Sequence, residues 1–449
     1  MIHVLFDLLA AVVVLIVLGG VMLLTKLCSD KLSAEVSRKI IHVTMGCVAL
    51  ALPFIITYKL TVVCLGVVAV VGLLFLRVNK SLRDGIGSAL LGITRKSFGE
   101  LYFVCSIVIV FVLHESTFEY LIPISVLTFA DSAAALVGTS YGRSNLAHTS
   151  ENAKSSEGSV MFFIVAFICT LVPLQLMTDT GRAEVLAISF LIGLLAAMIE
   201  VVSTDGNDNL LLPLLTYSFV RYNSGQTLDP LVFNFAVMLF FLVAILLVYR
   251  VTNLSKLSIA YCLLVGYIVM IQGGAIWVFP PLMLLLAFGI LPMMKSEEKH
   301  MIQTYKVVEC NAIVGLVCLW LAVFFPQYRD VLHVAFSLSF ACFLAINTYS
   351  RFVNFVNSSK LVAIFWGLAK AIVFIALPTW VITKMNWLVF VLYLVFLAVA
   401  MPPAVSLNMK YDYKNVGDNT FRANKILVGT VVAAFAVLLV VVGRFYDIP

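Results

Sequence analysis

Long apolar runs, most of them close to twenty residues, follow one another along almost the whole chain and are separated by short polar segments. A bilayer offers no hydrogen-bond partners to the backbone, so such runs are expected to form helices that satisfy their own N–H and C=O groups. Of the 449 residues, 62% are hydrophobic and only 12% are charged, whereas about a quarter of a soluble domain is charged. The sequence predicts an all-α, polytopic integral membrane protein, because uninterrupted apolar runs exclude the alternating pattern of a barrel.

We expect about sixteen transmembrane helices, with a range of roughly thirteen to sixteen because some segments are short for a crossing. The first run, residues 2–24, resembles a signal peptide in composition, but its start is not basic and no small-residue cleavage site follows it. The predicted spans are 2–24, 41–58, 60–77, 101–113, 120–139, 159–177, 184–203, 206–222, 231–249, 257–272, 275–294, 307–326, 331–350, 361–383, 387–405 and 426–443.

Basic residues gather in the short segments between the predicted spans. Cytoplasmic loops of membrane proteins carry an excess of Lys and Arg, and an N-terminus on the outside puts every basic cluster on the cytoplasmic face. The net charge of +6 therefore needs no nucleic-acid partner. We expect two membrane domains, 1–250 and 251–449, in a bacterial inner membrane or in an endoplasmic-reticulum or plastid membrane.

Two polar stretches stand at the starts of predicted spans. In "AEVSRKIIHVTMG" (34–46), Glu35, Arg38, Lys39 and His42 fall on one helical face. A basic anchor with snorkelling side chains is one interpretation, but a histidine one turn inside the bilayer favours a functional site. In "TRKSFGELYF" (94–103), Arg95, Lys96 and Glu100 lead into a short span, and a plain juxtamembrane basic cluster is the alternative there.

An aspartate lies inside the apolar segment "TFADSAAALVGTSYGR" (128–143). Asp131 is expected to be functional, because an ionisable side chain within a membrane span is costly without a role. Small residues, including Gly138 and Gly142, continue at helical spacing on its side. Tight packing between membrane helices accounts for the small residues, but it does not account for the carboxylate.

The loop "GRSNLAHTSENAKSSEGS" (142–159) is polar between two apolar spans. Arg143 and Lys154 can hold phosphate oxygens, and Gly142 and Gly158 allow backbone N–H groups to approach an anion. Glu157 precedes the next helix, where a carboxylate is also favourable for structural reasons alone. The loop therefore predicts a phosphate-binding element.

More carboxylates follow in "AAMIEVVSTDGNDNLLLPLL" (196–215). Glu200 lies near the cytoplasmic end of a span, and Asp205, Asp208 and Asn209 follow in the loop, where Asp205 also fits an ordinary turn. Oxygen ligands of this kind suit Mg²⁺, which binds through one or two carboxylates together with substrate phosphates. All five stretches lie on the predicted cytoplasmic face. They favour phosphoryl transfer, with the second substrate coming from the bilayer.

Five motifs in this order resemble one known family: RKxxH (38–42), GExY (99–102), ADSxAxxxGxxxGR (130–143), KSxEGS (154–159) and DNLxxPL (208–214). This set is similar to that of the CTP-dependent membrane kinases of isoprenoid alcohols, which include phytol kinases and dolichol kinases. The resemblance covers residues from about 34 to about 215. It implies an all-helical membrane fold and transfer of the γ-phosphate of CTP, with Mg²⁺, to the hydroxyl of a long-chain prenol.

The resemblance also implies site residues. The family motifs carry over to Arg38, Lys39, His42, Glu100, Asp131, Gly138, Gly142, Lys154, Glu157, Gly158, Ser159, Asp208 and Asn209. The expected catalytic residues are Asp131, Lys154, Glu157 and His42. The expected nucleotide-binding residues are Arg38, Lys39, Gly138, Gly142, Arg143, Gly158 and Ser159. The expected metal ligands are Asp131, Glu200, Asp208 and Asn209, and Glu100 has no assigned role.

The second half carries weaker signals. "VGYIVMIQGGAIWVFPPLMLLL" (265–286) and "YKVVECNAIVG" (305–315) are faintly similar to the membrane family of phytyl-phosphate kinases. That family continues with an acidic DT…SE motif, whereas "INTYSRF" (346–352) has Asn347 in place of the aspartate. A degenerate duplicate, a scaffold and a lipid-binding domain all remain open, and Glu309 and Asn311 are interpreted as buried packing groups.

Two other functions remain open. A lipid or small-molecule transporter or flippase also has many spans and intramembrane charges, but its site is expected near the bilayer midplane. A phosphatidate cytidylyltransferase-like enzyme also uses CTP, but its C-terminal acidic and glycine-rich signature is absent from this sequence. The position of the polar residues separates a transporter from a kinase.

Overall fold

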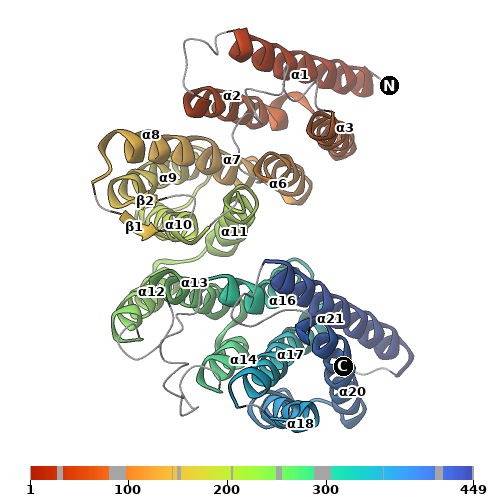
Figure 1. Ribbon diagram of the computed structural model, residues 1–449. Coiled ribbons are helices and arrows are strands. Elements are labelled where there is room, and N and C mark those ends of the chain that lie inside the picture. Colours follow the sequence, from red (N-terminus) through yellow and green to blue (C-terminus); the bar gives the residue numbers. More distant parts are fainter. Residues whose placement is uncertain are drawn as a thin grey trace. The chain divides into compact units, whose positions relative to one another are not determined.

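The computed structural model separates the chain into two compact units, Met1–Phe235 and Ala236–Pro449 (Figure 1). The predicted boundary lies later, after residue 250. The structure describes residues 2–27, 34–79, 98–143, 145–148, 153–203, 206–248, 255–287, 305–356, 358–409 and 418–446.

The described residues are almost entirely helical, and each of the predicted spans overlaps a helix. Within the described residues, eleven helices are long and apolar enough to cross a membrane, and four shorter apolar helices accompany them. A polytopic helical membrane protein is therefore confirmed. The number of crossings and the outside location of the N-terminus stay predictions.

Unit 1 contains the elements that carry the polar motifs. One continuous helix at its centre consists of α7, the π-helix η1 and α8. The elements are α1 (Ile2–Leu27), α2 (Ala34–Ile55), α3 (Lys59–Val78), α6 (Gly99–Leu113), α7 (Thr117–Ser125), η1 (Val126–Ala130), α8 (Asp131–Tyr141), β1 (Asn145–His148), β2 (Ala153–Ser155), α9 (Ser156–Met177), α10 (Arg182–Val202), α11 (Asp208–Asn223) and α12 (Leu228–Val248), which crosses the boundary between the units.

The core of unit 1 forms around the continuous helix α7–η1–α8 and around α10. Helix α9 packs against both α8 and α10, and α11 packs against α6, α7 and α10 (Figure 1). Ile122 and Leu127 on the central helix and Ile192 and Leu195 on α10 are completely buried. Helix α2 lies along α7 and η1, so its basic first turns come next to the start of α8.

A short antiparallel hairpin, which the all-helical expectation did not include, joins α8 to α9. Its strands β1 and β2 pair Ala147 with Lys154 and His148 with Ala153. A two-stranded hairpin is marginally stable by itself, and β2 also packs against α9. The hairpin therefore gives Lys154 a defined position directly before a helix start.

A buried carboxylate outside the predicted site has a structural role. Asp7 of α1 accepts hydrogen bonds from the backbone N–H groups of Thr57 (3.0 Å) and Tyr58 (2.8 Å) and from the hydroxyl of Thr61 (3.3 Å). These donors surround the start of α3, where backbone N–H groups lack partners within the helix. Asp7 thus ties α1 to the turn between α2 and α3.

Unit 2 is a second helical bundle around α17, which is the most buried of the candidate spans. Its elements are α13 (Lys256–Gly273), α14 (Ala275–Leu285), α16 (Tyr305–Phe324), the 3-10 helix η3 (Pro326–Tyr328), α17 (Arg329–Phe355), α18 (Lys360–Ala371), the π-helix η4 (Ile372–Ala376), α19 (Leu377–Thr383), α20 (Trp387–Met409) and α21 (Asp418–Tyr446).

Two pairs of polar side chains join helices of unit 2. Lys425 Nζ lies 2.8 Å from Glu309 Oε1, and Asn347 Nδ2 donates to Asn311 Oδ1 at 3.4 Å.

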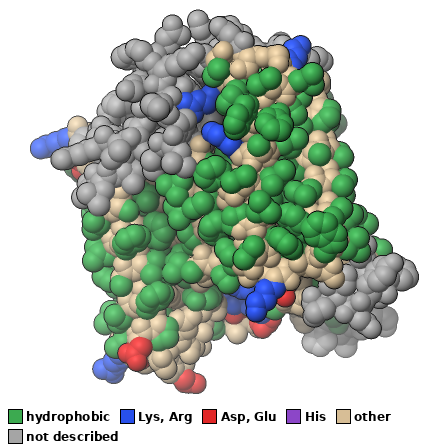
Figure 2. Space-filling view, turned by 90° about the horizontal axis from the view of Figure 1, so that it is seen from below, with side chains coloured by type: hydrophobic (Ala, Val, Ile, Leu, Met, Phe, Trp, Pro, Cys, Tyr) green, Lys and Arg blue, Asp and Glu red, His purple; other side chains and the backbone are tan. Residues whose placement is uncertain are grey.

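Figure 2 shows a face covered largely by hydrophobic side chains, with Lys, Arg, Asp and Glu at its edges. That distribution is the one expected of a surface in contact with lipid.

Candidate metal centre and its basic partners

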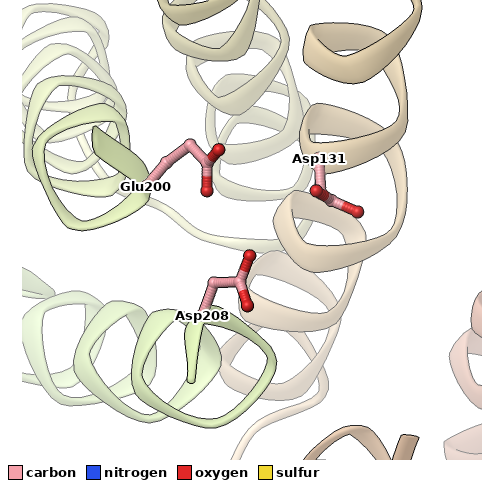
Figure 3. A group of neighbouring side chains, drawn as sticks. All are labelled: Asp131, Glu200 and Asp208. Atoms are coloured by element: carbon pink, nitrogen blue, oxygen red, sulfur yellow. The ribbon is translucent and has the colours of Figure 1, made fainter. Parts of the chain in front are cut away.

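Three carboxylates from three helices meet in unit 1. Asp131 begins α8, Glu200 lies near the end of α10 and Asp208 begins α11. One carboxylate oxygen of each lies within 4.8 Å of the other two, and Figure 3 shows the Glu200 and Asp208 side chains extending toward the helix that carries Asp131. Among the described residues, this is the one group of three or more His, Cys, Asp or Glu side chains close enough to hold a metal ion.

Asp131 is surrounded by residues from α2. Lys39 Nζ lies 2.6 Å from Asp131 Oδ2, and His42 Nε2 lies 3.5 Å from the same oxygen. His42 Nε2 also lies 3.1 Å from the carbonyl oxygen of Leu127, and its ring packs against Phe103. These contacts place Lys39 and His42, which the sequence predicted as site residues, directly beside Asp131.

The π-helix η1 immediately precedes Asp131. A π-turn inserts one residue into an α-helix and often occurs at functional sites. Here Thr128 donates its hydroxyl to the Ile124 carbonyl, and Ser132 donates to the Thr128 carbonyl. Gly46 of α2 packs on the Thr128 side chain so closely that a Cβ at Gly46 would overlap it. The missing side chain at Gly46 therefore permits the approach of α2 to η1.

Glu200 pairs with Lys154 from the hairpin. Lys154 Nζ lies 2.9 Å from Glu200 Oε1 and also donates to the backbone carbonyl of Glu200. The second contact satisfies a carbonyl in the last turn of α10, where a cation is favourable. Since Glu200 is next to Asp131, the structure brings Lys154 to the same cluster as Lys39.

Asp208 and its neighbour Asn209 differ in their contacts. Asp208 Oδ1 accepts the backbone N–H of Asn209 at 3.1 Å, and within the described residues Asp208 forms no ion pair. Asn209 donates its side-chain amide to the carbonyl oxygen of Gly99 at 3.0 Å. Asn209 therefore ties the start of α11 to the start of α6, and its expected role as a metal ligand stays a prediction.

The three predicted nucleotide-binding glycines surround one serine. Ser155 is the N-cap of α9, and its Oγ accepts the N–H of Gly158 at 3.1 Å. A Cβ at Gly138, Gly142 or Gly158 would lie about 3 Å from Ser155 Oγ. These glycines allow α8 and the start of α9 to approach each other closely. Ser155 has no role in the sequence analysis, although a serine directly before a helix start is a recognisable N-cap signal.

The remaining predicted residues have local contacts. Glu100 pairs with Arg77 of α3 at 3.1 Å, and the Arg77 guanidinium lies over the Phe98 ring. Ser159 donates its hydroxyl to the Ser155 carbonyl at 3.2 Å, and Glu157 accepts the hydroxyl of Ser156 at 3.1 Å.

Two further basic residues belong to the predicted site. Arg143 is exposed after α8, and Arg38 is half-buried on α2. Residues Arg95, Lys96 and Asp205, together with 144 and 149–152 of the polar loop, lie outside the described residues.

Comparisons with protein-family models, curated proteins and solved structures find no match. The residues of the cluster and their surroundings therefore carry the functional argument.

The carboxylate cluster fits a small divalent cation. Glu200 Oε2 is buried and, within the described residues, has no hydrogen-bond partner. Burying a carboxylate oxygen without a hydrogen-bond donor costs free energy. A cation bound beside Asp131 and Asp208 would give Glu200 Oε2 a partner. Carboxylate oxygens in small number are the ligands typical of Mg²⁺.

Most residues of the cluster lie near the ends of their helices. Lys39 is in the first turns of α2, Glu200 is two residues from the end of α10 and Asp208 is the first residue of α11. Helix α8 continues for ten residues beyond Asp131, to Tyr141, which corresponds to about 15 Å at 1.5 Å per residue. Asp131 therefore lies near the middle of the continuous helix α7–η1–α8, whereas Lys39, Glu200 and Asp208 lie near the ends of their helices.

Proposed function

We propose that unit 1 is a membrane kinase that transfers the γ-phosphate of CTP, or of another nucleoside triphosphate, to the hydroxyl of a long-chain isoprenoid alcohol of the phytol, polyprenol or dolichol type. The observation that carries the proposal is the meeting of three carboxylates and two lysines where α10 ends and α11 begins. Such a set of side chains can bind a polyphosphate through a metal ion while a lipid alcohol approaches from the bilayer.

Each residue of the cluster has a role in this proposal. Asp131, Glu200 and Asp208 would hold Mg²⁺, which supplies charge neutralisation and orientation to the phosphates when it is bound. Lys154 and Arg143 bind phosphate oxygens on the side of the hairpin. Lys39 and His42 keep the Asp131 carboxylate oriented, since both contact its Oδ2 atom.

The transfer conserves atoms and charge in one displacement. The prenol oxygen forms a bond to the γ-phosphorus, and the bond from that phosphorus to the β–γ bridging oxygen breaks, so CDP leaves. Asp131 accepts the hydroxyl proton if Glu200 and Asp208 hold the metal without it. Phosphoryl transfer of this kind depends mainly on positioning and on neutralised charge, which a rigid cluster on three helices can provide. The second substrate enters from the bilayer, and we propose that the site faces the cytoplasm, where nucleotides are present.

A direct assay tests the proposal. Purified full-length protein in detergent is incubated with γ-labelled CTP, Mg²⁺ and a panel of prenols, with an EDTA-treated sample and a sample without prenol as controls. We expect label in a lipid phosphate only when both Mg²⁺ and a prenol are present. A parallel reaction with γ-labelled ATP identifies the donor.

Other outcomes of the same experiment support different functions. Absence of labelled lipid from every prenol, together with counterflow of a lipid or solute in liposomes, would support a transporter or flippase. Transfer of label from α-labelled CTP to phosphatidate would support a cytidylyltransferase-like activity instead.

A further inference from the structure

Two of the three carboxylates in the cluster are already paired with ammonium groups. Lys39 lies 2.6 Å from Asp131, and Lys154 lies 2.9 Å from Glu200. Three carboxylates without these partners would carry three negative charges, whereas the paired cluster carries one. The two lysines come from separate elements, α2 and β2, so each lowers the charge of the cluster independently.

This charge determines which ligand binds well. A cluster with one negative charge attracts a free divalent cation only weakly, and the cation reverses the charge of the cluster to one positive. The cluster with its bound cation, which is positively charged, then favours binding of an anion. Charges as close as these lysines to the carboxylates are expected to change an affinity by about tenfold, so the lysines are close enough to decide the preference.

We propose that Lys39 and Lys154 are specificity-determining residues that make the cluster select a divalent cation accompanied by phosphate over the free cation. This inference rests on the proposed function, because it concerns the same carboxylates. It adds that the lysines oppose binding of the cation by itself and favour binding of the phosphates.

The geometry allows each lysine to contact a carboxylate of the cluster and a bound phosphate at the same time. A lysine ammonium has three N–H donors, and Lys39 gives one to Asp131 Oδ2 while its contact with the Asp131 carbonyl, at 3.4 Å, is long. The Lys39 side chain is only 7% exposed, and that of Lys154 is 19% exposed. Partial burial strengthens the electrostatic effect of both groups relative to surface lysines.

A purely structural role predicts a different result. Lys154 also binds the Glu200 carbonyl at the end of α10, and Lys39 joins α2 to α8. If the lysines only hold these helices together, their neutral variants misplace the carboxylates and bind a cation equally or more weakly. The sign of the change in cation affinity therefore separates the two roles.

The experiment measures binding of Mn²⁺, as a spectroscopic substitute for Mg²⁺, to full-length protein by the loss of the free Mn²⁺ electron paramagnetic resonance signal. Lys39→Gln and Lys154→Gln are expected to bind Mn²⁺ about tenfold more tightly than the native chain. In identical Mn²⁺ solutions, the same variants are expected to bind labelled inorganic pyrophosphate about tenfold more weakly. Lys59→Gln is the matched control, because among the described residues the Lys59 ammonium hydrogen-bonds only to the backbone carbonyls of Val112 and His114. Both affinities should stay native.

Arginine variants keep the experiment decisive if a glutamine variant aggregates. Lys39→Arg and Lys154→Arg retain the charge, so neither variant should show the tighter Mn²⁺ binding expected of the glutamine variants. Unchanged or weaker Mn²⁺ binding by folded glutamine variants would overturn the inference, as would tighter Mn²⁺ binding by an arginine variant. The binding experiment uses neither CTP nor a prenol, so its result does not depend on kinase activity. If the affinities change as expected but the protein transfers no phosphate to a prenol, the kinase proposal fails and the inference about the lysines stands.

Discussion

Replacement of Asp131 by Asn is expected to lower the rate of phosphate transfer to a lipid alcohol by roughly a thousandfold, because loss of a metal carboxylate removes several kcal/mol of charge stabilisation. Asp131 is one of the three carboxylates of the proposed metal site, and it also contacts Lys39 and His42. The measurement is the initial rate of label transfer from CTP to prenol by protein that elutes as a single species in detergent.

The Asp131→Asn variant leaves the Lys39 ammonium without its carboxylate, and an unpaired buried charge destabilises a fold by several kcal/mol. The double variant Lys39→Met/Asp131→Asn removes that charge and separates folding from catalysis. We expect the double variant to unfold at a temperature nearer the native one and to remain inactive. Near-native turnover in either variant would remove Asp131 from the mechanism.

Replacement of Gly46 by Ala is expected to lower both stability and activity, although Gly46 contacts no carboxylate. A Cβ there would overlap the Thr128 side chain and push α2 away from η1. Overpacking of this kind costs about 1–3 kcal/mol. Lys39 and His42 lie on the same helix, and a shift of about 1 Å in such groups can reduce a rate by about a hundredfold. Thermal unfolding and the transfer rate measure the two effects.

Two variants control for the change from glycine to alanine. A Cβ added at Gly72 on α3 would meet nothing within 4 Å, so Gly72→Ala should be neutral or stabilise the helix by up to about 1 kcal/mol. Thr128→Ala removes two of the three atoms that a Cβ at Gly46 would meet. Partial recovery is therefore expected in Gly46→Ala/Thr128→Ala. Native stability of Gly46→Ala alone would contradict the close approach of α2 and η1.

The sequence predicted the helices well because their physical cause is local. A run of about twenty apolar residues has few alternatives to a membrane helix, and every predicted span overlaps one. Helix α2 begins at Ala34, seven residues before the predicted membrane span, as the shared helical face of Glu35, Arg38, Lys39 and His42 had indicated. The first turns of α2, which contain Lys39, are basic and polar, so hydropathy by itself leaves them out of the predicted membrane span.

The carboxylates could be predicted, but their partners could not. Asp131 and Glu200 stand out because an acid within an apolar segment is costly. The pairs Lys39–Asp131 and Lys154–Glu200 join residues 92 and 46 positions apart, and helical periodicity contains no information on such distant contacts. Glu100 shows the same limit, since its partner Arg77 belongs to another helix.

Glycines were the most ambiguous signal. Gly138, Gly142 and Gly158 suit a loop that approaches phosphate, but the structure places them around Ser155 at the junction of α8 and α9. A missing side chain permits close approach of any neighbour, whether a ligand or another backbone. Sequence composition does not distinguish the two, so a role of these glycines in nucleotide binding stays a prediction.

The five-residue π-segment η1 has a consequence for how this kind of site can be gained or lost in evolution. A π-turn corresponds to one residue inserted into an α-helix, and one residue turns the following helix by about 100°. Deletion of a single codon in η1 would leave the apolar character of the span intact while it turned Asp131 away from Glu200 and Asp208. Related chains with every motif residue present but one residue fewer between Ser125 and Asp131 would then keep the bundle and lose the carboxylate cluster.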